Sequence, residues 1–259
     1  MEVNEFESED TSLFNIISEW TQLGGDIDGE AAGDRSGRSV SLSSNGTIVA
    51  IGADGNDGNG SNSGHVRVYQ YQYSNSSWNQ IGLDIDGDDN GDNSGFSVSL
   101  SYDGTIVAIG APRNDGDGSQ SGLVRVYKWD ESDSNDLKWI KLGEDIDGEA
   151  NYDFSGYSVS LSSDGTIVAI GAPGGGMINN TFGDTSGHTR VYKYRQYTND
   201  DDDLYMYNSF VQDTSQTKPI IVTNTPPSEG NYYWFQLGKD IDGESVSYNS
   251  GQSVSLSSD

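Results

Sequence analysis

The chain of 259 residues contains no cysteine, so disulfide bonds are excluded and cysteine usage does not report the redox compartment. Basic residues are also scarce: 13 Lys and Arg stand against 41 Asp and Glu, for a formal net charge of −28. Nucleic-acid binding needs a basic face, because phosphates are repelled by an acidic surface. The charge therefore excludes nucleic acid as a partner, disfavours anionic membranes, and leaves cations, basic partners and neutral ligands such as sugars open.

Long apolar segments are missing as well. No run approaches the ~20 residues that a helix needs to span a bilayer. The first ten residues, MEVNEFESED, are acidic and lack the apolar core of a secretory signal. We therefore expect no membrane insertion and no signal peptide in this chain.

What the chain does contain is glycine, with 34 residues, and aromatic residues, with 15 Tyr and 5 Trp. A hydrophobic content of 32% together with high net charge favours disorder. The aromatic residues and repeated β-branched runs favour strands instead. The length fits one large all-β domain or two average domains.

An internal repeat dominates the sequence. The tetrapeptide DIDG begins at Asp26, Asp84, Asp145 and Asp240, at spacings of 58, 61 and 95 residues, and each copy leads into the same series of segments. SVSLS begins at Ser39, Ser97, Ser158 and Ser253; GTIVAIGA begins at Gly46, Gly104 and Gly165; VRVY or TRVY begins at Val66, Val124 and Thr189; a segment opening on tryptophan begins at Trp20, Trp78, Trp139 and Trp234.

These segments predict four strands in each repeat. SVSLS alternates with period two, as a half-buried strand does, and TIVAIGA is apolar on both faces, as an interior strand is. Between them lies SSNG, SYDG or SSDG. An Asn-Gly or Asp-Gly pair between two strands is a strong hairpin signal, because both central residues take positive φ. The third strand is VRVY, and the tryptophan segment is the fourth.

Four antiparallel strands in a unit of about sixty residues predict a blade of a β-propeller; a stacked or irregular all-β array is the alternative. We assign residues 1–19 to an acidic segment, interpreted as a degenerate strand, and residues 20–259 to propeller blades, with an insertion at 195–233. The sequence holds three complete four-stranded antiparallel blades and pieces of a terminal one. We expect an incomplete propeller that closes with missing blades or with another chain.

The segment SGYSVSLSSDGTIVAIGAP at 155–173, followed by SGHTRVYKY, resembles the FG-GAP repeat of integrin-α-type β-propellers. The resemblance implies an extracellular or cell-surface recognition module. Many members of that family carry a D-x-D-x-D-G calcium loop between the first and second strands. Here that connection is only SSNG, SYDG or SSDG, which offers too few oxygens for the six to eight that calcium takes. The family's calcium site therefore does not transfer.

The DIDG segments have two open interpretations. They do not follow the EF-hand pattern, because Gly stands at positions four and twelve. Repetition in every unit favours a structural turn, in which Asp bonds its own backbone and Ile27 and its equivalents fill the core between blades. The alternative is a hard divalent cation, Ca²⁺ rather than Zn²⁺. Its candidate ligands are Asp26, Asp28, Asp34, Asp84, Asp86, Asp92, Asp145, Asp147 and Asp153.

Other candidate residues are few. His65 and His188 open the third strand where the second copy has Leu123, which indicates a packing position rather than a catalytic one. The insertion offers Tyr205, Tyr207 and Phe210 as a partner-binding arm, against a plain solvated loop.

We therefore expect a non-catalytic recognition or adhesion module that binds a glycan or protein through its loop faces, with Ca²⁺ as a possible aid. One alternative is a carbohydrate-active hydrolase, which clustered acids of raised pKa would favour. The other alternative is a purely structural surface repeat.

Overall fold

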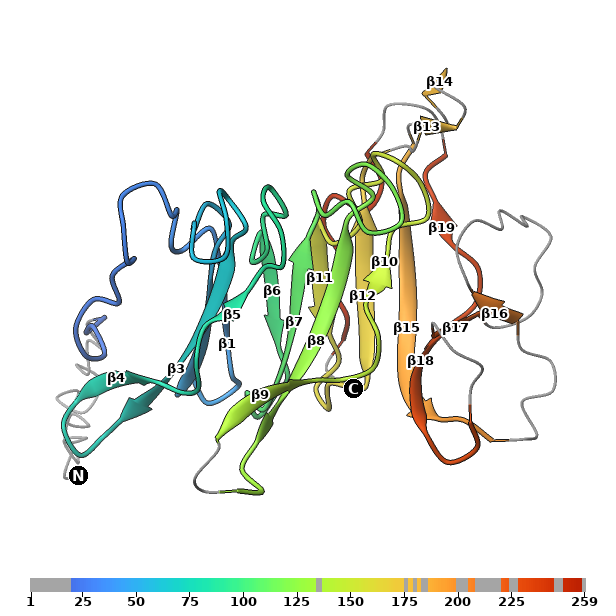
Figure 1. Ribbon diagram of the computed structural model, residues 1–259. Helices are drawn as coiled ribbons and strands as arrows, with labels where there is room; N and C mark the ends of the chain where they lie inside the picture. Colours follow the sequence, from blue (N-terminus) through green and yellow to red (C-terminus); the bar gives the residue numbers. More distant parts are fainter. Residues whose placement is uncertain are drawn as a thin grey trace, which may run out of the picture.

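The computed structural model describes residues 20–133, 137–174, 177–178, 181–182, 186–198, 205–207, 220–223, 228–244 and 249–257. Within these ranges the chain is all-β, and its strands form three consecutive blade-like antiparallel sheets that stand side by side without closing into a ring (Figure 1). The described residues include no helix long and apolar enough to cross a membrane. The fold is thus an incomplete propeller, as the repeat predicts.

The three blades share one topology. The first consists of β1 (Ser39–Leu42), β2 (Ile48–Ala53), β3 (His65–Gln72), β4 (Ser77–Gln80) and β5 (Ile85–Asp86). The second consists of β6 (Ser97–Leu100), β7 (Ile106–Ala111), β8 (Leu123–Asp130), β9 (Lys138–Lys141) and β10 (Ile146–Asp147). The third contains β11 (Ser158–Leu161), β12 (Ile167–Ala172), β15 (His188–Gln196), β18 (Tyr232–Gln236) and β19 (Ile241–Asp242). The four predicted strands of each unit are therefore confirmed.

A short fifth strand in each blade is new. The Ile-Asp of DIDG pairs with the start of the third strand, for example Ile85 with Val66 and Asp86 with His65. Ile85 and Ile146 are buried, as expected of side chains that fill the core between blades, whereas Ile241 is 60% exposed. The DIDG segment is therefore part of the loop between two blades and also contributes a short strand to the sheet.

The third blade also carries additional strands. A hairpin joins β13 (Met177–Ile178) to β14 (Thr181–Phe182), and β17 (Ile220–Val222) pairs with the outer edge of β18. β16 (Tyr205–Tyr207) runs parallel to β17. Tyr205 and Tyr207 thus have a described backbone only, Phe210 lies outside the described residues, and the binding role of all three stays a prediction.

Two apolar clusters fill the seams between blades, because GTIVAIGA is buried on both faces as predicted. One joins Ala50, Val66, Val68 and Ile85 of the first blade to Val98, Leu100, Val107 and Ile109 of the second. The other joins Ala108, Val124, Val126 and Ile146 of the second blade to Val159, Leu161, Val168 and Ile170 of the third. Val98 is 9% exposed, whereas its equivalent Val40 in the first blade is 64% exposed.

Polar latches lie beside each apolar seam. At the inner strands the Ser99 hydroxyl accepts a hydrogen bond from Leu161 N at 3.0 Å, and the Ser97 hydroxyl donates to Gly156 O at 2.7 Å. At the outer strands Trp139 Nε1 donates to Ile81 O at 3.1 Å. The serines of SVSLS and the tryptophan of the fourth strand therefore join neighbouring blades.

Candidate functional site

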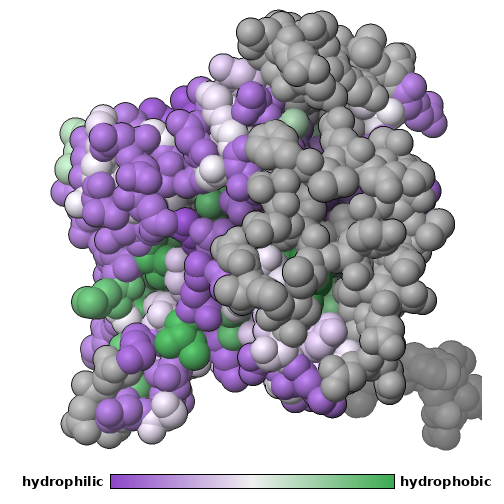
Figure 2. Space-filling view, turned by 45° about the vertical axis from the view of Figure 1, so that its right-hand side comes forward, coloured by the Kyte–Doolittle hydropathy of each residue, from purple (hydrophilic) through white to green (hydrophobic). Residues whose placement is uncertain are grey.

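The DIDG loops and the loops between the second and third strands lie at one end of the sheets (Figure 1). We call this end the loop face; it comprises residues 26–37, 54–64, 84–95, 112–122, 145–156 and 240–244. The two kinds of loop are bonded together: Asn59 Nδ2 donates to Gly87 O at 2.9 Å, and Asn93 N donates to Asn62 O at 3.1 Å. The coloured surface at the upper left of Figure 2 is mostly hydrophilic. The two kinds of loop are thus joined by hydrogen bonds into one polar surface.

Position nine of the DIDG loops is buried and has internal partners. Asp34, Asp92 and Asp153 are 5%, 3% and 3% exposed. The Asp92 carboxylate accepts hydrogen bonds from Asp89 N at 3.0 Å and from Asn114 Nδ2 at 2.9 Å, and Asp34 has the same kind of partners. These bonds fit the structural-turn interpretation of position nine.

Positions one and three differ from position nine in exposure and charge. Asp26, Asp28 and Asp86 are exposed, and Asp84, Asp145 and Asp147 are half-buried. Burial, together with the neighbouring carboxylates of Asp117 and Asp145, raises the pKa of Asp147 to about 6. Burial also raises the pKa of Asp86. Calcium binding by positions one and three stays a prediction.

The central arginine of each third strand is a functional residue that sequence reasoning missed. Each reaches the acid at position five of the preceding DIDG loop: Arg67 to Glu30, Arg125 to Asp88 and Arg190 to Glu149. The side chains of Arg67 and Arg125 are 9% exposed and that of Arg190 is 2% exposed. The signal was available, because a cation inside an apolar strand of an acidic chain needs a buried partner.

The acid at position one meets a side chain four residues earlier. Gln80 Nε2 donates to Asp84 Oδ1 at 2.6 Å, while Lys141 Nζ lies 2.7 Å from Asp145 Oδ1. Burial acts to raise the pKa of Asp145, but hydrogen bonds from Arg125 and Lys141 outweigh burial and lower that pKa below its ordinary value. The second blade therefore neutralises this acid with two cations.

Aromatic side chains gather where the loop face meets the inner strands. The Arg38 guanidinium lies 4.1 Å from the centre of the Phe96 ring, and the Phe96 and Tyr157 rings lie 4.7 Å apart. Tyr152 and Phe154 form a second pair, with ring centres 6.4 Å apart. Both members of that pair have positive φ, 64° at Tyr152 and 55° at Phe154.

The Tyr152 conformation is unusual because the equivalent position is glycine in the first two DIDG loops, Gly33 and Gly91. A left-handed conformation costs a non-glycine residue about 1–2 kcal/mol. Strain of this kind is found preferentially at functional sites. Tyr152 is therefore a candidate binding residue that the sequence pattern did not single out.

The family comparison supports the repeat assignment. Residues 27–69, which run from the first DIDG loop into β3, match the family model described as the FG-GAP repeat. This stretch is an FG-GAP repeat. The second and third blades repeat its SVSLS, TIVAIGA and RVY segments in the same sheet positions, so the resemblance drawn from the sequence is confirmed.

No curated protein matches the chain. Solved structures similar to it include the periplasmic gluconolactonase of Pseudomonas aeruginosa, at 13% identity over 60% of this chain and 38% of that one, with a TM-score of 0.39. A putative 6-phosphogluconolactonase from Bacteroides uniformis has 12% identity over 60% and 36%, with a TM-score of 0.34. Hydrazine synthase of Kuenenia stuttgartiensis has 12% identity over 60% and 39%, with a TM-score of 0.33. This chain thus spans less than two fifths of each.

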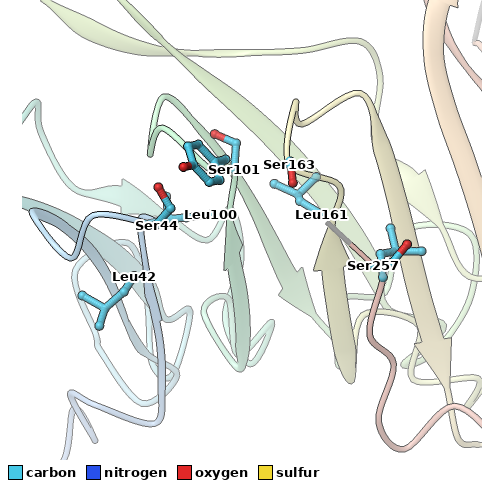
Figure 3. A pocket seen from close by; sticks show the side chains of 9 residues that line it. Leu42, Ser44, Leu100, Ser101, Leu161, Ser163 and Ser257 are labelled. Atoms are coloured by element: carbon cyan, nitrogen blue, oxygen red, sulfur yellow. The ribbon is translucent and has the colours of Figure 1, made fainter. Parts of the chain in front are cut away.

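The opposite end of the blades holds a hollow of about 210 Å³. Leu42, Leu100 and Leu161, from successive inner strands, line it together with Ser44, Ser101, Ser163 and Ser257 (Figure 3). The carboxylates with raised pKa lie at the other end of these strands, on the loop face. The hollow and the acids therefore do not form one site.

Proposed function

We propose that this chain is a non-catalytic recognition module of the extracellular type, which binds a glycan through its loop face. The observation that carries the proposal is the Tyr152–Phe154 pair, held at positive φ on a face of hydrogen-bonding loops. Ligand sites commonly combine aromatic surface with a few placed polar groups. Here the aromatic rings would pack against a sugar ring, and neighbouring carboxylates and amides would bind its hydroxyls.

Calcium assistance belongs to the same proposal. Exposed carboxylates of the loop face, such as Asp28 and Asp86, are hard oxygen ligands, and calcium also accepts oxygens from a bound sugar or from water. An adhesion role would follow if the glycan belongs to another cell, and a protein partner is the other outcome that the test distinguishes.

The test is a glycan array probed with the chain in Ca²⁺ and in chelator. The wild-type chain should bind a defined set of glycans, and Tyr152→Gly should lose that binding without unfolding, because the other loops use glycine there. Tyr102→Ser is the matched control: Tyr102 is 63% exposed on a hairpin at the opposite end, where the other two hairpins have serine. Equal loss in both variants, or no glycan bound by the wild type, would overturn the proposal.

A carbohydrate-active hydrolase is the second candidate, and the pKa of Asp147, raised to about 6, is the observation that favours it. A carboxyl with such a pKa is suited to act as a general acid near neutral pH. Turnover of aryl glycosides that disappears in Asp147→Asn would replace the recognition module by an enzyme. Binding without turnover would retain it.

A further inference from the structure

Two groups of side chains on the described part of the chain bring three metal-ligating atoms within 4.8 Å of one another. The first is Glu30, His65 and Asp84, and the second is Glu149, His188 and Asp240. Both draw on the same repeat positions: position five of one DIDG loop, the first residue of the third strand, and position one of the next DIDG loop. The same arrangement has thus been built twice.

The histidine of the first group is buried and lacks a hydrogen-bond partner at the nitrogen that faces the acids. His65 is 1% exposed, and its Nδ1 accepts and donates no hydrogen bond. This atom lies 3.5 Å from Asp84 Oδ2 and 3.9 Å from Glu30 Oε2. His188 Nε2 is likewise buried without a hydrogen-bond partner, and it lies 3.9 Å from Asp153 Oδ2. A buried nitrogen left unpaired is costly, so an absent partner is expected between these groups.

The second blade shows what takes that place when no histidine is present. There Leu123 replaces the histidine, and Arg125 bonds both the position-five acid, Asp88, and the position-one acid, Asp145. Its guanidinium therefore occupies the space between the two carboxylates as a resident cation.

In the outer two blades the arginine stays near the position-five acid, but its Nη2 donates to a backbone oxygen instead of to the position-one acid. Arg67 Nη2 donates to the backbone oxygen of Asp28 at 2.7 Å, and Arg190 Nη2 donates to that of Asp147 at 2.9 Å. The residue that bonds the position-one acid changes as well. It is Lys141 in the second blade but neutral Gln80 and Gln236 in the others. Around the position-one acid, the arginine and the lysine of the second blade are thus replaced in the outer blades by a histidine and a neutral amide.

We propose that Glu30, His65 and Asp84 bind a divalent transition-metal ion of the zinc class, and that Glu149, His188 and Asp240 bind a second one. One imidazole nitrogen with two carboxylate oxygens suits such an ion, whereas calcium takes oxygen ligands. The ion takes the place that the Arg125 guanidinium fills in the second blade.

The geometry needs only a small adjustment. Zinc bonds of 2.0–2.2 Å in a tetrahedron place ligand atoms about 3.3–3.5 Å apart. His65 Nδ1 and Asp84 Oδ2 are already 3.5 Å apart, and the Glu30 side chain is 49% exposed, with Asn56 Nδ2 at 3.4 Å from its Oε2. Gln80 holds the other oxygen of Asp84, as a partner outside the ligand sphere commonly orients a ligating carboxylate. Three protein ligands leave one position open to water or to a partner's group.

The test is calorimetric titration of Zn²⁺ into the full chain, purified without a polyhistidine tag and cleared of metal with a chelator. Two Zn²⁺ should bind per chain. His65→Leu, which copies the second blade, should remove one site, His188→Leu the other, and the double variant both. Glu30→Gln should weaken the first site at least tenfold while leaving the buried residues untouched. Thermal unfolding of each metal-free variant checks that the fold is retained.

Asp89→Asn is the control, because Asp89 lies exposed on the same face and belongs to neither group; it should bind two Zn²⁺ as the wild type does. Zn²⁺ binding that is absent, or that is equal in the wild type and the double histidine variant, would overturn the proposal. The glycan experiment above uses other residues, so either proposal can fail alone.

Discussion

Gly110→Ala tests the seam between the second and third blades. Gly110 lies in β7 with an ordinary φ, and a Cβ added there would lie 2.0 Å from Gly156 O and 2.4 Å from the Ser97 hydroxyl oxygen. Ordinary contacts between heavy atoms are about 3.5–4.0 Å, so the blades would have to separate by more than about 1 Å. The obstacle is backbone, which cannot rotate away as a side chain can.

The expected loss has two parts. Overpacking of a close contact costs about 1–3 kcal/mol. Separation also breaks the 2.7 Å bond from the Ser97 hydroxyl to Gly156 O, which contributes about 1 kcal/mol. The free energy of unfolding should therefore fall by about 2–4 kcal/mol. Urea unfolding followed by tryptophan fluorescence measures it, with the midpoint moving and the slope unchanged.

Two other glycines separate the close contact from backbone effects. Gly91→Ala introduces positive φ strain without any neighbour within 4 Å, and should cost about 1–2 kcal/mol. Gly25→Ala has neither feature, and its effect should stay within about 0.5 kcal/mol. If Gly110→Ala matches Gly25→Ala, the blades are not in contact through this glycine and the reasoning fails.

Three further predictions concern single side chains. Burial acts to raise the pKa of Asp103, but hydrogen bonds from Thr105 and Ser101 outweigh burial and lower that pKa. The Asp103 carboxylate therefore stabilises the fold at pH values above its unfolded pKa, and this stabilisation is lost as the pH falls through the folded pKa. Asp103→Asn should remove this acid-side loss in a pH series of unfolding midpoints, and an unchanged profile would contradict it. Ser99→Ala leaves Leu161 N without its acceptor and should cost about 1–3 kcal/mol in urea unfolding, whereas a neutral result would contradict the latch. Tyr152→Gly should stabilise the chain by about 1 kcal/mol while abolishing glycan binding, and destabilisation would show that the φ of 64° is not strained.

The repeat let the sequence predict most of the blade. Alternation in SVSLS, continuous burial in TIVAIGA and an Asn-Gly or Asp-Gly pair between them are local signals, because strand periodicity and turn conformation depend on neighbouring residues. The order of strands within each blade followed from this pattern. The hydrogen bond from the tryptophan of the fourth strand to the neighbouring blade was not visible in the sequence.

The sequence by itself therefore determined the unit: its strands, its turns, its acidity and its resemblance to the FG-GAP repeat. The tertiary structure decided what the units do to one another. It brought His65 together with Glu30 and Asp84, which are separated by 54 residues, and turned Arg125 into the cation of the second blade. It also separated the buried turn acid at position nine from the more exposed acids at positions one and three. These distinctions arise between loops and strands far apart in the chain, so no pattern within a single repeat contains them.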